Sequence, residues 1–244
     1  MRLRVSLLSK KSQILPINYS YHLASMIYRC IQRGDAMLSL YLHKPKTIKF
    51  FTFSKLMAEK RKIEEDIIEV EGNVYFEFSS PKKNIVVALL NGLLEKPMVE
   101  IKNAEFTLSS IEILKEKKIA GKETFVTLSP ISITTVKGSN GYRKIVDLYP
   151  NEPKFYENLR KNLIKKYKLL YGKEPKNKEI DIEVIKAKPK RIKIKNTYHR
   201  CVEMVFRAKG SKELLEIGYK AGFGERNSMG FGMVKVANIR RREK

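Results

Sequence analysis

The chain is poor in the residues that build disulfide-rich, metal-bound and membrane-spanning proteins. It has two cysteines, Cys30 and Cys201, with no CxxC pair and no tryptophan, which excludes a disulfide framework. Its three histidines lack any short metal-ligand spacing, so nothing predicts a metal site or another cofactor. No apolar run approaches the roughly 20 residues of a membrane-spanning helix, and the first residues lack a signal-like apolar stretch. We therefore expect a cytoplasmic protein that does not enter a membrane.

Acidic residues are also scarce relative to basic ones. The 244 residues include 50 Lys+Arg against 26 Asp+Glu, for a formal net charge of +24. Basic residues run from Arg2 to Lys244, so the excess is not confined to a tail. A charge of this size attracts polyanions, of which nucleic acid is the usual one. Since 43% of the residues are hydrophobic, the chain can still build one large domain or two small ones.

Apolar periodicity predicts an α+β protein whose two halves repeat one order of elements. The first half has expected strands over 1–8, 49–54, 74–80 and 106–114 and expected helices over about 18–33, capped by Asn18 or Ser20, and 81–94, with Pro81 in the first turn. The second half has expected strands over 124–136, 181–194, 199–208 and 231–237 and expected helices over 152–171 and 212–220. Strand, helix, strand, strand, helix, strand is the ferredoxin-like order. We expect two tandem ferredoxin-like domains, 1–118 and 119–244, around a central cleft.

Glycine is concentrated near the end of the chain. Five of the 13 glycines lie between Gly218 and Gly232, in GYKAGFGERNSMGFGMVKV. Glycine allows close backbone approach, so such a loop can present N–H groups to phosphates. The candidate RNA contacts in this loop are Gly222, Gly224, Arg226, Asn227 and Ser228. The alternative is a helix cap, a turn and a strand start. Neither a Walker loop nor a dinucleotide fingerprint is present.

A second basic segment, KAKPKRIKIKNTYHR at 186–200, alternates Lys or Arg with apolar residues. On a strand, the side chains at 191, 193 and 195 fall on one face, where they can bind consecutive phosphates. The candidate RNA contacts here are Lys186, Lys188, Lys190, Arg191, Lys193 and Lys195, with Arg207 on the predicted return strand. The alternative is a solvated strand edge that lysines protect from aggregation.

The segment LHKPKTIKFF, residues 42–51, places a histidine among three lysines. Those lysines disfavour the charged imidazole unless an anion such as a phosphate is bound nearby. RNA carries its own nucleophile, the 2′-OH, so its cleavage needs only a group that orients this hydroxyl, an acid for the leaving 5′-oxygen and a cation. His43 suits the second role and a lysine the third. Tyr28, on the polar face of the preceding helix, is a candidate for the first; the alternative is a half-buried boundary tyrosine.

Several of these motifs together resemble the CRISPR-associated endoribonucleases of the sixth Cas family, archaeal type. They are MIYRCI at 26–31, LYLHKPKTIKFF at 40–51, IKAKPKRIKIK at 185–195 and the glycine-rich stretch. The resemblance implies metal-independent cleavage of precursor CRISPR RNA in its repeat, leaving a 2′,3′-cyclic phosphate and a 5′-OH. It also implies a catalytic triad of Tyr28, His43 and Lys49. Lys46 is the rival for the lysine and otherwise an RNA contact; we prefer Lys49 because it opens a predicted strand.

The resemblance also names partners. It implies that single-stranded CRISPR repeat RNA lies in the cleft between the domains, which agrees with the way proteins read splayed bases. It allows proteins of a CRISPR effector complex as further partners. The oligomeric state stays open between a monomer and a weak homodimer. Two alternatives remain: a non-catalytic RNA-binding subunit of a CRISPR ribonucleoprotein, since some family members lack the histidine, and a basic structural protein of a particle such as the ribosome.

Overall fold

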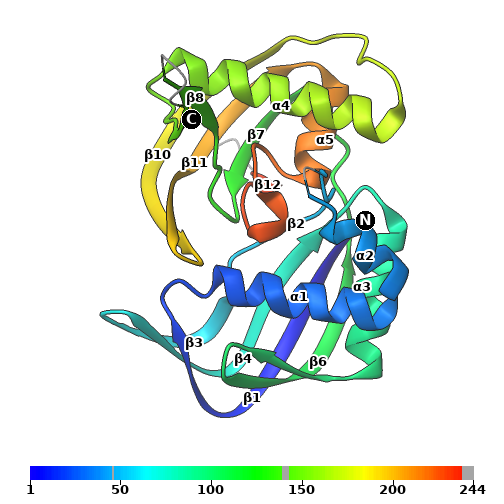
Figure 1. The fold of residues 1–244 in the computed structure, drawn as a ribbon, viewed down its shortest axis with the longest axis vertical. Coiled ribbons are helices and arrows are strands. Elements are labelled where there is room, and N and C mark those ends of the chain that lie inside the picture. The colour runs from blue at the N-terminus through cyan, green and yellow to red at the C-terminus, as the bar shows by residue number, and fades with distance from the viewer. Residues whose placement is uncertain (46, 139–142, 238–244) are drawn as a thin grey trace, which may run out of the picture.

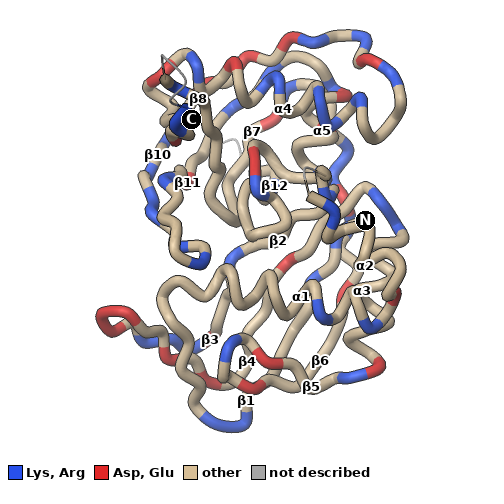
Figure 2. The backbone as a smooth tube through the Cα atoms, in the orientation of Figure 1, with Lys and Arg blue, Asp and Glu red and all other residues tan. Residues whose placement is uncertain are grey.

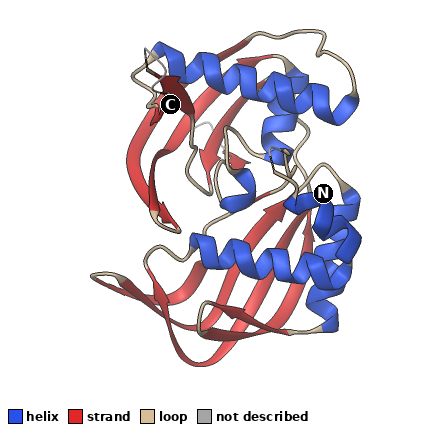
Figure 3. Ribbon diagram, viewed as in Figure 1, coloured by secondary structure: helices blue, strands red, loops and turns tan. Residues whose placement is uncertain are grey.

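The computed structural model describes residues 1–45, 47–138 and 143–237. It consists of two α+β halves stacked along the long axis of the molecule, each with helices packed against an antiparallel sheet (Figures 1 and 3). The glycine-rich stretch, red in Figure 1, lies between the halves and faces the first helix. Buried apolar side chains of both halves join in one continuous core.

The N-terminal half is built on a six-stranded sheet of order β2-β4-β1-β6-β5, with β3 paired to β4. Its elements are β1 (Arg2–Pro16), α1 (Ser20–Gly34), α2 (Ala36–His43), β2 (Thr52–Phe53), β3 (Met57–Glu64), β4 (Ile67–Ser79), α3 (Lys83–Glu95), β5 (Met98–Ile101) and β6 (Ala104–Leu114). The central strand β1 pairs with both β4 and β6 in antiparallel register. This is the strand order of the ferredoxin-like unit, as predicted.

The C-terminal half repeats this arrangement in a four-stranded sheet of order β10-β11-β7-β12. Its elements are β7 (Lys122–Thr127), β8 (Thr134–Lys137), β9 (Lys144–Asp147), α4 (Pro153–Tyr171), β10 (Ile180–Ile194), β11 (Thr197–Gly210), α5 (Lys212–Ala221), the 3₁₀ turn η1 (Asn227–Met229) and β12 (Val234–Val236). The first strand again pairs with the third and the fourth. The long β10–β11 hairpin was expected; β8 overlaps the end of the segment expected as strand at 124–136, and β9 was not expected.

Close packing against α3 fixes α1, which carries Tyr28. A Cβ atom at Gly34 would overlap the carbonyl oxygen of Ala88, and one at Gly92 would overlap that of Cys30. The two helices therefore touch backbone to backbone, which only glycine permits at these points. The helix ends at Gly34, as its sequence predicts.

Three local expectations were wrong. Asn18 does not cap α1; its side-chain oxygen instead accepts a hydrogen bond from the backbone N–H of Lys193, 3.0 Å away. Pro81 precedes α3 rather than lying in its first turn. The strand expected over 49–54 is only Thr52–Phe53, because Phe50 has a left-handed backbone (φ 52°) that interrupts extended structure. Lys49 therefore lies in a connecting segment and does not open a strand.

Side-chain donors of the N-terminal half bind the backbone of the C-terminal half. Arg2, only 3% exposed, donates to the carbonyl oxygens of Tyr219 (3.1 Å) and Val234 (2.8 Å). The Thr52 hydroxyl donates to the Phe231 carbonyl at 2.9 Å, and Ser79 makes the same kind of bond to Lys220. Buried polar groups with partners of this kind hold one geometry. The two halves are therefore held together as one body.

Within the described residues, no helix is both long and apolar enough to cross a membrane. Over the same ranges, no three His, Cys, Asp or Glu side chains gather as ligands of a metal ion would.

Candidate active site

His43 is the last residue of α2, a helix that the sequence analysis did not predict. Asp35 starts this helix, since its side chain accepts a hydrogen bond from the N–H of Leu38 at 2.8 Å. Leu42 is buried, whereas His43 is exposed. The Nδ1 atom of His43 lies 2.8 Å from the carbonyl oxygen of Ser39. Since a carbonyl only accepts, Nδ1 carries a hydrogen, and Nε2 is the nitrogen that can exchange a proton with a ligand.

Tyr28 lies directly beside this imidazole. The two ring centroids are 5.1 Å apart, and the Tyr28 ring also meets Phe51 edge to face at 5.5 Å. Burial raises the pKa of the Tyr28 hydroxyl, and a hydrogen bond with the Ser228 side chain opposes that rise. At neutral pH the residue is therefore a neutral phenol. Its hydroxyl can orient a ligand hydroxyl by hydrogen bonding.

Lys49 reaches the same end of α2 from the connecting segment. Its Nζ donates to the carbonyl oxygen of Lys44, the residue after His43, at 2.5 Å. The C-terminal end of a helix carries partial negative charge, which favours a cation there. Partial burial lowers the pKa of Lys49. The predicted rival, Lys46, lies outside the described residues, so the choice of Lys49 rests on this contact and on the sequence.

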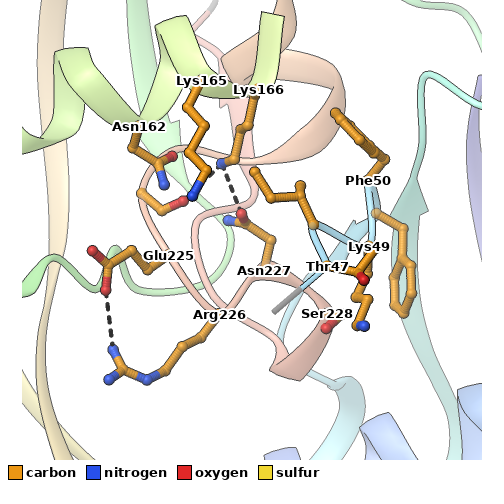
Figure 4. Close-up of a pocket in the computed structure, with 13 residues that line it drawn as sticks. Thr47, Lys49, Phe50, Asn162, Lys165, Lys166, Glu225, Arg226, Asn227 and Ser228 are labelled. Atoms are coloured by element: carbon orange, nitrogen blue, oxygen red, sulfur yellow. Dashed lines mark hydrogen bonds and ion pairs between the residues drawn. The ribbon is translucent and has the colours of Figure 1, made fainter. Parts of the chain in front are cut away.

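A hollow of about 330 Å³ opens beside Lys49 (Figure 4). The segment 47–51 lines one side, and α4 and residues 224–228 line the other. Ser228 faces this hollow and also touches Tyr28, so the C-terminal half supplies part of the site. Tyr28, His43, Lys49 and Ser228 form one group of side chains, which we call the candidate site.

The glycine-rich loop is not an open row of N–H groups. Gly222 and Gly224 are buried, and the N–H of Gly222 already donates to the carbonyl of Gly218 at 2.9 Å. The Asn227 amide is bonded within the loop as well, to the carbonyls of Phe223 and Phe231. These bonds hold the shape of the loop, and contact of Gly222, Gly224 and Asn227 with RNA stays a prediction. The half-exposed Arg226 and Ser228 remain able to meet a ligand.

The predicted rail on β10 is divided between two faces of the hairpin. Lysines at 186, 188 and 190 follow a register shift and share one face, whereas Arg191 and Lys193 share the other. Lys195 lies in the turn that joins β10 to β11 and has a positive φ of 52°. Lys190 lies 4.0 Å from a carboxylate oxygen of Glu203, and Arg207 pairs with Glu183 on the neighbouring strand. Figure 2 shows Lys and Arg along β10 and at the hairpin tip.

Sequence reasoning missed three residues of this region, Asp35, Ser39 and Lys166, although the sequence carries a signal for each. Asp35 directly after Gly34 is a helix-start signal for α2, and Ser39 lies one turn before His43. Lys166 falls on the stripe of Phe155, Leu159 and Leu163, at a helical spacing that is otherwise apolar. A lysine in the buried face of a helix needs a partner, and the structure provides one in the glycine-rich loop (Figure 4).

Comparison with known proteins agrees with this geometry. A family model described as CRISPR associated protein Cas6, C-terminal, matches residues 114–236, and one described as CRISPR-associated protein Cas6, N-terminal, matches residues 14–112. The chain belongs to the Cas6 family. This confirms the family predicted from the sequence motifs.

Relatives of the Cas6 family match over most of the chain. CRISPR-associated endoribonuclease Cas6 of Pyrococcus furiosus is 42% identical, over 91% of this chain and 83% of its own. CRISPR-associated endoribonuclease Cas6 1 of Methanocaldococcus jannaschii is 41% identical, over 96% and 92%. A solved structure, described as that of a Cas6-related gene from Pyrococcus furiosus, is similar with a TM-score of 0.91 at 36% identity, covering 98% of this chain and 99% of its own. The tandem ferredoxin-like Cas6 fold is thereby confirmed.

Proposed function

We propose that this chain is an endoribonuclease that cuts CRISPR repeat RNA by attack of the 2′-OH on the adjacent phosphate. The observation that carries the proposal is an exposed imidazole, that of His43, whose Nδ1 is bonded to a carbonyl and whose ring lies 5.1 Å from that of Tyr28. Relatives named CRISPR-associated endoribonucleases, at 41% and 42% identity, support the substrate class. Because that substrate is an RNA transcript, we place the activity in the cytoplasm.

Each side chain of the candidate site has a distinct task. The Tyr28 phenol accepts a hydrogen bond from the 2′-OH and orients its oxygen toward phosphorus, where the new O–P bond forms as the hydroxyl proton is lost to solvent. Protonated at both nitrogens, His43 gives the Nε2 proton to the 5′-oxygen as the P–O5′ bond breaks. Lys49 leaves the Lys44 carbonyl to stabilise the additional negative charge on the phosphorane. The products are a 2′,3′-cyclic phosphate and a 5′-OH, and the nucleophile comes from the substrate, so no step requires a metal.

A single-turnover assay in excess EDTA tests the proposal. End-labelled RNA that contains one CRISPR repeat should be cut at one phosphodiester bond within the repeat, and the upstream fragment should end in a cyclic phosphate. A scrambled single strand of the same composition should stay intact. Tight binding of the repeat without cutting would instead make this chain a non-catalytic RNA-binding subunit. Equal binding of both strands without cutting would favour a basic structural protein.

The single strand has a second place to bind, between the start of α1 and the hairpin tip. A hollow of about 430 Å³ is lined there by Tyr21 and His22 from one half and by Lys193, Lys195 and Tyr198 from the other. The Arg191 guanidinium lies 3.9 Å from the centroid of the Tyr198 ring. Cations beside aromatic rings suit a single strand, whose phosphates and bases bind to the two kinds of group. We propose that residues 119–244 grip the RNA here while residues 1–118 supply the catalytic side chains.

Neutralising three basic residues near the tip of the β10–β11 hairpin should weaken RNA binding, by an amount that depends on the salt concentration. The variant carries Arg191→Gln, Lys193→Gln and Lys195→Gln. If each cation neutralises one phosphate, the slope of log K against log salt should become shallower by about 2, because single strands give roughly 0.7 per contact. The slope is measured by fluorescence anisotropy with labelled repeat RNA.

A control variant loses the same charge elsewhere, with Lys154, Lys161 and Lys168 of α4 changed to glutamine. Each of these lysines pairs with a glutamate on the surface. Its slope should stay near that of the wild type. Equal slopes for the two variants would mean that only the total charge matters and that the hairpin makes no specific contacts.

A further inference from the structure

A buried lysine joins α4 to the glycine-rich loop. The Lys166 side chain is 1% exposed, and its ammonium donates to the carbonyl oxygens of Gly222 (2.6 Å) and Gly224 (2.7 Å) and to the side-chain oxygen of Asn227 (2.7 Å). An ammonium has three N–H bonds, so each donor has one acceptor. Figure 4 shows Lys166 reaching down from α4 to Asn227.

Asn227 extends this contact across the loop. While its oxygen accepts from Lys166, its amide nitrogen donates to the carbonyls of Phe223 (3.2 Å) and Phe231 (3.0 Å). The loop is thereby tied at both of its ends, and the N–H of Phe223 donates to the carbonyl of Gly232 at 2.8 Å. The next residue, Ser228, lies in η1, which packs against α1, and its side chain neighbours the Tyr28 hydroxyl.

We infer that Lys166 is a positioning residue: its ammonium sets the shape of the glycine-rich loop and so holds Ser228 against Tyr28. The inference rests on the proposed function, because Tyr28 matters to the reaction only if the chain cuts RNA. It assigns Lys166 no contact with RNA. It makes α4, in the RNA-gripping half, part of the support of the candidate site.

Packing alone does not account for a lysine at this position. Burial of an ammonium is unfavourable, and the neighbours on the same face of α4, Leu159 and Leu163, are apolar. Burial lowers the pKa of Lys166 to about 7, with Glu225 opposing that shift. A neutral amine has two N–H bonds and would leave one of the three oxygens without a donor. The three acceptors therefore require the charged ammonium of Lys166. Its burial lowers the stability of the fold, and its hydrogen bonds fix the shape of the glycine-rich loop.

The test compares Lys166→Met with Lys161→Met, a control on the exposed side of the same helix. At saturating protein, Lys166→Met should slow single-turnover cleavage about 10- to 100-fold, the effect expected of a small misplacement near the reacting atoms. Lys161→Met should cut at the wild-type rate. Amide hydrogen exchange should become faster over residues 222–232 in the first variant only.

A double-mutant cycle with Ser228→Ala separates positioning from a general loss of stability. If Lys166 acts through Ser228, the double variant should cut no more slowly than Lys166→Met alone; multiplied effects would overturn the inference. If Lys166→Met does not fold, Asn227→Ala replaces it in the same cycle. It removes one acceptor of the Lys166 ammonium and the two amide donations to Phe223 and Phe231, and it leaves the ammonium bonded to the carbonyls of Gly222 and Gly224. A wild type that binds repeat RNA without cutting it would refute the proposed function. Unchanged amide hydrogen exchange over residues 222–232 of the Lys166→Met variant would refute the positioning role of Lys166, whether or not the wild type cuts RNA.

Discussion

Replacement of His43 by alanine should slow the cutting of bound repeat RNA by about 10²–10⁴-fold, the usual contribution of a general acid. The 5′-oxygen is a poor leaving group unless it gains a proton as its bond to phosphorus breaks, and Nε2 of His43 is the proposed donor. The side chain is exposed, and among the described residues its hydrogen-bond partner is Ser39 of its own helix. Removal should therefore leave the fold and the RNA affinity almost unchanged. Single-turnover rates at saturating protein measure the chemical step.

His22→Ala is the matched control for this experiment. His22 lies in the first turn of α1, beside Tyr21 and next to the second hollow. At saturating protein it should cut at the wild-type rate, even if its affinity falls. Equal cleavage rates for His43→Ala and the wild type would show that His43 is not the general acid of the reaction.

Removal of one oxygen atom from the RNA should have a still larger effect. A repeat with a 2′-deoxy nucleotide immediately upstream of the scissile phosphate has lost the proposed nucleophile, so no cut should be detectable there. Binding should change little, because the protein grips the strand through phosphates and bases along its length. Gel analysis of the end-labelled repeat gives the rate, and anisotropy gives the affinity.

The control RNA carries the deoxy nucleotide one position further upstream and should be cut normally. Product ends provide the second readout. A deoxy substrate that is still cut, with a 3′-OH on one fragment and a 5′-phosphate on the other, would show that water attacks the phosphate. The tasks assigned to Tyr28, His43 and Lys49 would then be wrong.

Much of this architecture follows from local patterns in the chain. Helices α1, α3, α4 and α5 have apolar stripes that their spacing reveals, and Gly34 marks the end of α1. The hairpin of β10 and β11 follows from its alternating side chains. The order of elements then predicts two ferredoxin-like halves, and family motifs identify Tyr28, His43 and Lys49 as candidates.

The parts that could not be predicted depend on contacts between distant segments. No periodicity relates Ser228 to Tyr28, because the two residues meet only when the halves dock. Phe50 adopts a positive φ although aromatic residues favour strands, since its ring is buried by tertiary packing.

The hydrogen bonds between the halves restrict the choice of residue type more on the donor side than on the acceptor side. Arg2, Thr52 and Ser79 provide donors through their side chains, so only a few residue types can stand at those positions. Their acceptors at Lys220, Phe231 and Val234 are main-chain carbonyls, which every amino acid carries. Substitution on the acceptor side therefore leaves these bonds in place. Sequence drift can therefore alter the C-terminal half without detaching it from the half that holds His43.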